Sequence, residues 1–190
     1  KNVGTDKLVS VTGITLDGVD SANYSFASIS DTVADVTQRT LTFTTTGIDK
    51  IYDGTTDASF LYADDRVTGD DLLLTGTATF DDKNVGADKV VSVTAIGLEG
   101  VDAANYNFQL TSTTTADITQ RVLLITASGV DKIYDGTNSA TTQYSDNRAI
   151  GDDLTNTGTA VFDDKNVGTD KDIAITDIVV DGTDAVNYSF

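Results

Sequence analysis

The chain has 190 residues, a formal net charge of -18 and no cysteine, histidine, proline, methionine or tryptophan. Without cysteine the fold has no disulfides, and without cysteine or histidine the usual ligands of zinc, haem and copper are missing, as are the commonest general base and the thiol nucleophile. Acidic residues are spread over the whole chain, so its surface repels phosphate backbones, and nucleic acid is not an expected partner. No apolar run approaches the ~20 residues of a membrane-spanning helix, and we expect no membrane insertion.

An internal repeat with a fixed period organises the sequence. The stretch FDDKNVGADK at residues 80–89 returns as FDDKNVGTDK at 162–171, and the chain opens within a third copy, KNVGTDK. Lys1, Lys83 and Lys165 therefore stand 82 residues apart, with no insertion between copies. A period of this length predicts a tandem array of similar domains.

The period divides the chain into three pieces. We expect the C-terminal part of a repeat at 1–38, a complete repeat at 39–120, and a repeat that lacks its last strand at 121–190, all belonging to a longer array. No Gly-, Pro- or Ser-rich spacer separates the pieces, since Thr119, Gln120 and Arg121 pass directly from one repeat to the next. Such a short connection should restrict bending between repeats.

The complete repeat has the pattern of an all-β domain. Short stretches alternate between apolar and polar residues, Gly and Asp punctuate them, and no segment has a helical period. Six or seven strands in a small β-sandwich are expected. The residues predicted to face the core are Leu41 and Phe43; Leu72, Leu74, Gly76, Ala78 and Phe80; Val91, Val93 and Ala95; Tyr106, Phe108 and Leu110; Ala116 and Ile118.

One block favours an immunoglobulin-like strand order. DAANYNF at 102–108 has counterparts at 20–26 and 184–190. Tyr106 stands two residues before Phe108, as in the tyrosine corner of immunoglobulin-type domains, where the hydroxyl bonds back to the backbone. A β-grasp-like small sheet is the alternative.

The combination of blocks resembles a known family. KIYDGT, a Gly-Asp pair, FDDKNVGxDK, an Asn-Tyr pair and a closing ADITQR look like the YDG-type repeat. Such repeats occur in very long bacterial exoproteins, including filamentous-haemagglutinin-like adhesins. The resemblance covers the whole chain. It implies an extracellular array at the bacterial cell surface, and it brings no catalytic residues and no defined ligand.

Paired aspartates in the predicted turns are the candidate metal ligands. Clustered carboxylates suit Ca²⁺, which takes six to eight oxygens. The candidates are Asp81, Asp82 and Asp88, with Asp163, Asp164 and Asp170 one period on. The alternative is a set of polar turns on an acidic surface, in which Lys83 and Lys89 form local ion pairs with neighbouring aspartates and compete with a metal.

The tyrosines of the KIYDGT blocks have two interpretations. Tyr52 and Tyr134 would be anchors for a sugar or a protein if they were exposed on a turn. We favour the alternative, in which the ring packs over the end of the domain.

These observations predict a non-enzymatic structural protein. The expected role is a semi-rigid stalk or spacer in an extracellular bacterial adhesin or fibre, with neighbouring repeats of the same chain as partners and other copies as potential partners in a fibre. One alternative is that each repeat binds carbohydrate or protein weakly, with avidity supplied by repetition. Another is a subunit that polymerises by exchanging strands.

Overall fold

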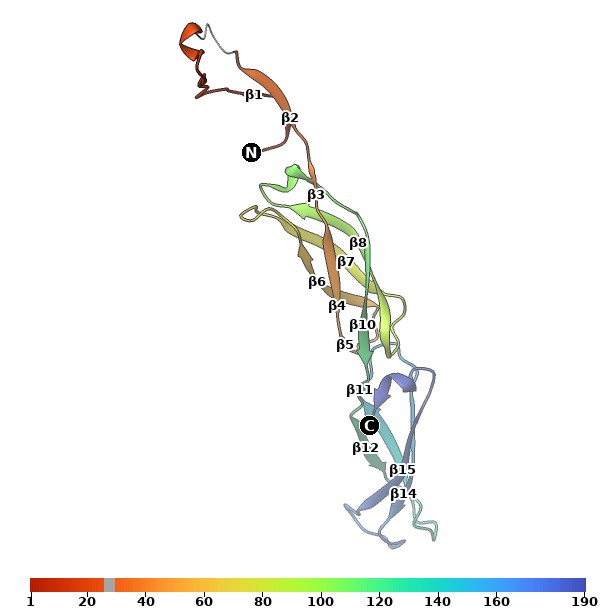
Figure 1. Cartoon of the computed structure of the whole chain (residues 1–190). Coiled ribbons are helices and arrows are strands. Elements are labelled where there is room, and N and C mark those ends of the chain that lie inside the picture. Colours follow the sequence, from red (N-terminus) through yellow and green to blue (C-terminus); the bar gives the residue numbers. More distant parts are fainter. Residues whose placement is uncertain (26–29) are drawn as a thin grey trace. The chain divides into compact units, whose positions relative to one another are not determined.

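The computed structural model describes residues 1–25 and 30–190 and confirms the predicted all-β class. In this part of the chain the regular elements are strands and three single-turn 3-10 helices (Figure 1). Phe26, the last residue of the first Asn-Tyr block, lies outside the described residues. No helix within the described ranges is both long and apolar enough to cross a membrane.

The N-terminal piece contains one strand pair. Strands β1 (Gly4–Val9) and β2 (Thr32–Val36) are antiparallel, and the 3-10 helix η1 (Ser21–Asn23) lies in the connection between them. The register shifts between Gly4 and Lys7, where Asp6 has a φ of 49°. An extra residue in the left-handed region is the signature of a β-bulge.

The complete repeat folds around one curled sheet. Its elements are β3 (Arg39–Thr40), β4 (Phe43–Ile48), β5 (Lys50–Ile51), β6 (Asp57–Asp64), β7 (Leu73–Phe80), β8 (Gly86–Glu99), η2 (Ala103–Asn105), β9 (Tyr106–Asn107) and β10 (Ser112–Thr119). Six of these strands form a sheet in the order β4-β6-β7-β8-β10-β5. The first and last strands of this order are consecutive in the chain, so the sheet nearly closes into a barrel. Gly47 sits at the seam, where an added Cβ would lie 2.5 Å from the Thr115 carbonyl oxygen.

The C-terminal repeat follows the same course with smaller sheets. Its elements are β11 (Arg121–Val122), β12 (Ile125–Val130), β13 (Thr141–Asp146), β14 (Thr155–Phe162), β15 (Ile173–Asp181), η3 (Ala185–Asn187) and β16 (Tyr188–Ser189). Strands β12 and β13 form one antiparallel pair, and β14 and β15 form another. Strand β11 runs parallel to β16.

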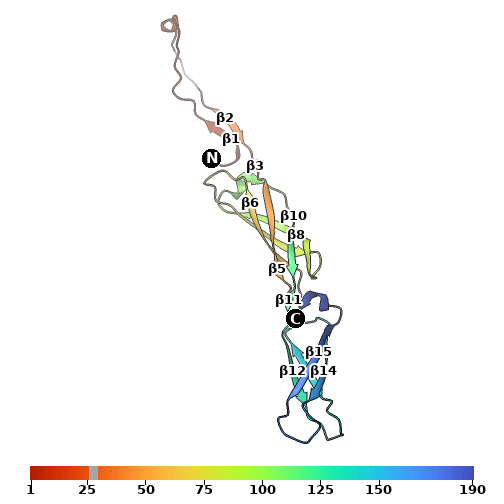
Figure 2. The same cartoon turned by 60° about the horizontal axis from the view of Figure 1, so that its bottom comes forward.

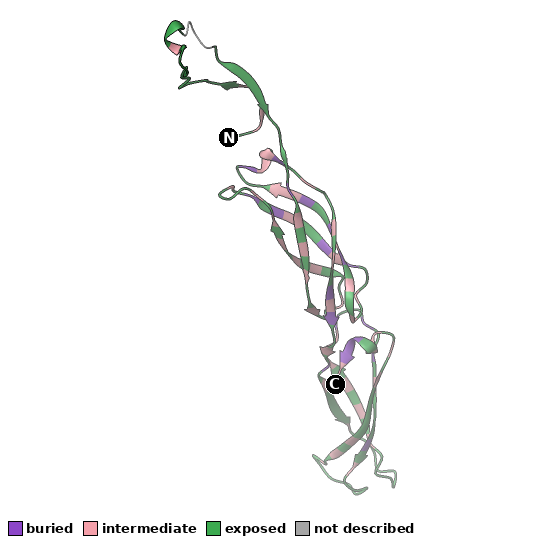
Figure 3. Ribbon diagram, in the orientation of Figure 1, coloured by how far each residue is buried: buried purple, intermediate pink, exposed green. Residues whose placement is uncertain are grey.

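Most residues predicted to face the core do so. Leu41, Leu72 and Tyr106 form a buried cluster, against which Leu98, Ala103 and Phe108 pack. Buried, intermediate and exposed positions follow one another along the strands (Figure 3). The other predicted core residues that the structure buries are Leu74, Ala78, Phe80, Val91, Val93, Ala116 and Ile118.

Three of the predicted core positions are wrong, since Gly76, Ala95 and Leu110 are exposed. Ala95 is exposed and Ile96 is buried instead, because Ala95 has a φ of 50° and inserts one residue into the alternation of β8. Leu110 is 66% exposed, because the predicted strand at 105–110 is reduced to Tyr106–Asn107. The immunoglobulin-like order and the β-grasp-like alternative both stay predictions.

The chain divides into two compact units that do not coincide with the repeats. One comprises Lys1–Thr44, Tyr62–Gly76 and Thr94–Ser112. The other comprises Thr45–Leu61, Thr77–Val93 and Thr113–Phe190. The division falls inside the complete repeat, so each junction between successive repeats lies within one unit. The joints are therefore packed parts of the molecule.

Replacing Phe80 tests the register of β7. Phe80 is 4% exposed, and we expect Phe80→Ala to cost about 3–5 kcal/mol in the free energy of unfolding, measured with urea. Leu73→Ala on the opposite face of the same strand is the control, since Leu73 is 52% exposed and its loss should cost less than about 1 kcal/mol. Equal costs for the two variants would show that the assigned faces are wrong.

Candidate functional site

The junction between the complete and the C-terminal repeat is built around one lysine. Lys83 comes from the FDDKNVG block, and its Nζ lies 2.6 Å from Asp152 Oδ1 and 2.8 Å from Asp184 Oδ1. Asp152 belongs to the Gly-Asp pair of the next repeat, and Asp184 to its Asn-Tyr block. With Tyr52 and Tyr188 these three residues form the junction cluster, which lies within one compact unit.

The carboxylate of Asp152 is fully enclosed by its partners. Its side chain is 1% exposed, and its Oδ2 accepts hydrogen bonds from the hydroxyls of Tyr52 at 2.8 Å and Tyr188 at 2.6 Å. The two rings meet edge to face, with centroids 5.4 Å apart. The Tyr188 hydroxyl also accepts the backbone N–H of Ala149 at 2.7 Å. A buried carboxylate requires such partners, because an unpaired charge there would be strongly destabilising.

The electrostatics of the cluster favour the ion pair. Burial alone would raise the pKa of Asp152, but hydrogen bonds from Lys83, Tyr188 and Tyr52 outweigh it and hold that pKa below its usual value. Hydrogen bonds to Asp152 and then to Asp184 raise the pKa of Lys83. Burial, followed by the bond to Asp152, raises the pKa of Tyr188 to about 12. Burial likewise raises the pKa of Tyr52, so both tyrosines remain neutral donors at physiological pH.

Two amide side chains extend the junction beyond the charged cluster. Asn187 is fully buried; its Oδ1 accepts the backbone N–H of Val85 at 2.9 Å, and its Nδ2 donates to Asn84 Oδ1 at 3.1 Å. Gln120 is the single residue between β10 and β11. Its Nε2 donates to the carbonyls of Val186 and Tyr188, both at 3.0 Å. The connecting residue is thereby bonded to the repeat that it enters.

The preceding junction repeats these contacts one period earlier, within the other compact unit. Lys1 Nζ lies 2.6 Å from Asp70 Oδ1 and 2.8 Å from Asp102 Oδ1. The hydroxyl of Tyr106 donates to Asp70 Oδ2 at 2.7 Å and accepts the backbone N–H of Val67 at 3.0 Å. The amide contacts recur as Asn105 with Val3 and Asn2, and as Gln38 with Ala104 and Tyr106. The same junction thus forms twice in one chain.

The structure separates the two interpretations of the tyrosines. Tyr52 is 1% exposed and packs in the junction cluster, as predicted. Its counterpart Tyr134 is 57% exposed. The predicted local pairing of Lys83 with a neighbouring aspartate is wrong, because both of its carboxylate partners come from the next repeat.

The predicted calcium ligands of the complete repeat lie around a second lysine. Lys89 Nζ is 3.3 Å from Asp81 Oδ1 and 2.8 Å from Asp82 Oδ1. Asp88 has a φ of 51°, and its backbone N–H donates to Asp117 Oδ1 at 2.8 Å. An ammonium group therefore occupies the paired carboxylates that a cation would need.

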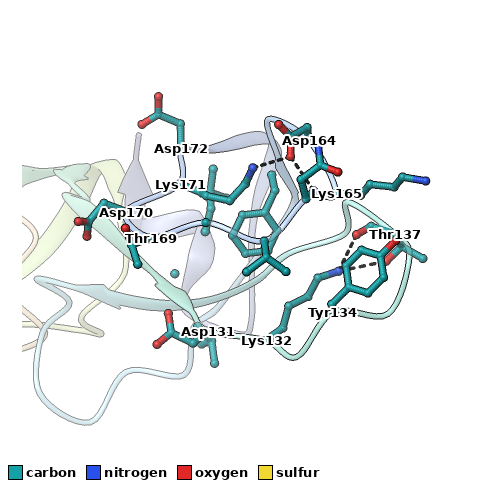
Figure 4. A pocket seen from close by; sticks show the side chains of 17 residues that line it. Asp131, Lys132, Tyr134, Thr137, Asp164, Lys165, Thr169, Asp170, Lys171 and Asp172 are labelled. Atoms are coloured by element: carbon teal, nitrogen blue, oxygen red, sulfur yellow. Dashed lines mark hydrogen bonds and ion pairs between the residues drawn. The ribbon is translucent and has the colours of Figure 1, made fainter.

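The C-terminal repeat has the same arrangement. Lys171 Nζ lies 2.8 Å from Asp163 Oδ1 and 2.6 Å from Asp164 Oδ1, and Figure 4 shows Asp170 apart from this group. Residues 1–25 and 30–190 contain no group of three or more acidic side chains that could hold a metal ion. Calcium binding stays a prediction.

A pocket of about 690 Å³ in the C-terminal repeat is lined by Gly129, Lys132, Tyr134 and Lys171 among others (Figure 4). In the complete repeat the counterpart of Gly129 is Gly47, which lies against Thr115 and Ala116 of β10. Strand β10 begins at Ser112, and the position one period later, 194, lies beyond the 190 residues given. The pocket therefore lies at the position that β10 covers in the complete repeat.

Comparison with known proteins identifies the family. The family model of the YDG domain matches residues 37–116 and 119–190, so the chain belongs to the YDG domain family and carries two copies of the domain. Neither the curated proteins nor the solved structures gave a match to this chain.

The sequence blocks shared by the two copies converge on the junctions. The junction residues come from four blocks of the repeat pattern: Lys83 from FDDKNVG, Asp152 from the Gly-Asp pair, Asp184 and Asn187 from the Asn-Tyr block, and Gln120 from the closing ADITQR. We did not predict that Asp152, Asp184 and Asn187 meet Lys83 and its neighbours. The sequence signal that could have indicated these contacts is that the lysine, the Gly-Asp pair and the Asn-Tyr block recur together with a fixed period.

Removing the junction lysine should change the titration of its partner. In Lys83→Ala, Asp152 loses its cation but stays buried, so we expect the pKa of Asp152 to rise above its value in the wild type, measured by carboxyl NMR titration. Leaving this charged acceptor without its main partner should cost on the order of 1–3 kcal/mol. Lys165→Ala is the matched control, because Lys165 holds the same motif position and makes no ion pair among the described residues. An unchanged Asp152 pKa would contradict the assigned pairing.

The junction should weaken on acidification. The pKa of Asp152 is lower in the folded state than in the unfolded state. Its contribution to the free energy of unfolding is therefore present above the unfolded pKa of about 3.9, and it is lost as the pH falls through the folded pKa. The pKa of Lys83 is raised in the folded state, so its contribution to the free energy of unfolding is fully present below the unfolded pKa of about 10.4. The difference in melting temperature between wild type and Lys83→Ala should therefore be constant from about pH 5 to 9 and shrink below about pH 4. A difference that grows in acid would contradict this assignment.

Proposed function

We propose that this chain is a spacer segment of an extracellular bacterial adhesin or fibre, in which each YDG repeat holds its neighbour at a fixed angle. The observation that carries the proposal is the use of the recurring residues. The lysine of FDDKNVG, the Gly-Asp aspartate and the Asn-Tyr block all contribute to the junction cluster or to the amide contacts beside it. The residues that recur in each repeat are thus the ones that attach it to the next repeat.

Two further features support a spacer. A single residue joins β10 to β11, and that residue is itself bonded to two carbonyls of the following repeat. A connection of this length leaves little freedom for bending. The net charge of -18 would keep a long extracellular array soluble.

The location and the partners follow from the same proposal. A bacterial cell surface suits a long, acidic array that needs neither a metal nor a disulfide at its joints. The nearest partners are neighbouring repeats. A binding function would have to reside elsewhere in the adhesin or on surface residues that the junctions leave open, of which Tyr134 is the most exposed tyrosine of a KIYDGT block.

Small-angle scattering in calcium and in EGTA tests the proposal. We expect the wild-type chain to give the same radius of gyration in both conditions, because lysine ammonium groups serve as the cations of the junctions. The double variant Lys83→Ala/Gln120→Ala should give a broader distribution of distances. Lys165→Ala should match the wild type.

The contrary outcomes have distinct meanings. A wild-type chain that is flexible in both conditions would refute the spacer. A chain that becomes flexible only in EGTA would instead support calcium at Asp81, Asp82 and Asp88 and their counterparts.

A further inference from the structure

Short parallel strand pairs recur at the ends of each repeat. Strand β3 pairs with β9, with Arg39 opposite Tyr106 and Thr40 opposite Asn107. Strand β11 pairs with β16 in the same way one period on. The short strand β5 pairs with the end of β10, with Lys50 opposite Ile118, and Figures 1 and 2 both place β5 beside β10.

Each parallel pair joins the beginning of a repeat to its end. A parallel pair cannot be closed by a hairpin turn, since its strands must be connected by a long crossover. Here the crossover is nearly the whole repeat: β3 is the first strand of the complete repeat and β9 precedes its last. Strand β11 is the first of the C-terminal repeat, and β16 is the last strand that the structure describes there. Tension along the chain therefore loads the pair β3–β9 where it enters the complete repeat, and it loads β10 and its parallel partner β5 where it leaves.

The direction of the strands decides how that tension acts. Pulling on the chain draws β3 from its N-terminal end, whereas the pull from the other side reaches the C-terminal end of β9 through β10, which is itself held between β8 and β5. In a parallel pair these two ends lie at opposite ends of the ladder. The force then runs along the strands and loads all hydrogen bonds between them together, whereas a hairpin pulled at its open end loses its bonds one at a time.

Several bonds reinforce each pair. Beyond the paired residues, Leu41 N–H donates to the Asn107 carbonyl at 2.8 Å. At the other end, Gln38 Nε2 donates to the carbonyls of Ala104 at 3.1 Å and Tyr106 at 3.2 Å. The glutamine side chain thus lengthens the ladder on the side from which β3 is pulled.

The same reinforcement occurs one period on. Leu123 N–H donates to the Ser189 carbonyl at 2.7 Å, and Gln120 takes the place of Gln38. At the seam of the barrel, Tyr52 N–H donates to the Thr119 carbonyl at 2.9 Å. The reinforcement therefore belongs to the repeat pattern.

We propose that these parallel pairs are tension clamps that make each YDG repeat resist stretching along the chain. This goes beyond the proposed spacer function, because the junction cluster limits bending between repeats whereas the clamps limit extension within a repeat. A chain could have either property without the other. The load would be external force on the array, such as drag on an attached cell.

The test is to pull the same ladder in two directions. The chain has no cysteine, so paired cysteines provide unique attachment points. Thr37, Ala104 and Gln109 are exposed and flank β3 and β9. In Thr37→Cys/Gln109→Cys, force applied to the full chain shears the pair. In Thr37→Cys/Ala104→Cys, it separates the same strands from one end.

We expect the shearing direction to give a severalfold higher rupture force in single-molecule pulling. Forced rupture reports the kinetic barrier, so the comparison is independent of the equilibrium stability that both variants share. Adding Gln38→Ala should lower the shearing force while leaving the force in the other direction nearly unchanged. A purely structural role for Gln38 would lower both.

Equal rupture forces in the two directions would overturn the proposal. That result would leave the spacer function intact, since scattering tests bending. Conversely, a chain that proves flexible in scattering but strong in shear would refute the spacer and keep the clamps.

Discussion

A buried carboxylate that is neutralised by a residue of the preceding repeat is the constraint on which this structure depends. Asp152 has almost no contact with solvent, and its counter-ion Lys83 lies 69 residues earlier in the chain. Breaking such a pair is far more costly than breaking a surface ion pair, which is worth about 0–1 kcal/mol. Adjacent repeats are therefore coupled in their folding as well as in their position. The compact units agree with this coupling, since each encloses a junction and the division falls inside the complete repeat.

The fold class and most of the core followed from local patterns. Alternation along β7 correctly placed Phe80 inside, because a regular strand keeps a period of two. The pattern failed at Ala95 because a single residue at positive φ moves every later side chain to the other face. An alanine in the sequence gives no indication of a positive φ. The pattern also failed at Leu110 because β9 ends at Asn107, and an apolar residue does not by itself extend a strand.

The candidate site was harder to predict for a physical reason. Neighbouring aspartates such as Asp81 and Asp82 can be recognised in the sequence as a local cluster. In the structure they form ion pairs with the ammonium group of Lys89. The junction cluster joins residues that are far apart in sequence, and composition gives no measure of such proximity. The common period of the blocks was the one sequence signal for these contacts, since residues that contact one another across every junction must recur with the same period.

The recurrence of the ion pairs at the junction has a genetic consequence. Lys1 meets Asp70 and Asp102 at the same distances at which Lys83 meets Asp152 and Asp184. Any repeat can then follow any other without a specially adapted surface. Duplication or deletion of one whole period would leave every remaining joint intact, so recombination between copies could lengthen or shorten the array in single steps while each product still folds.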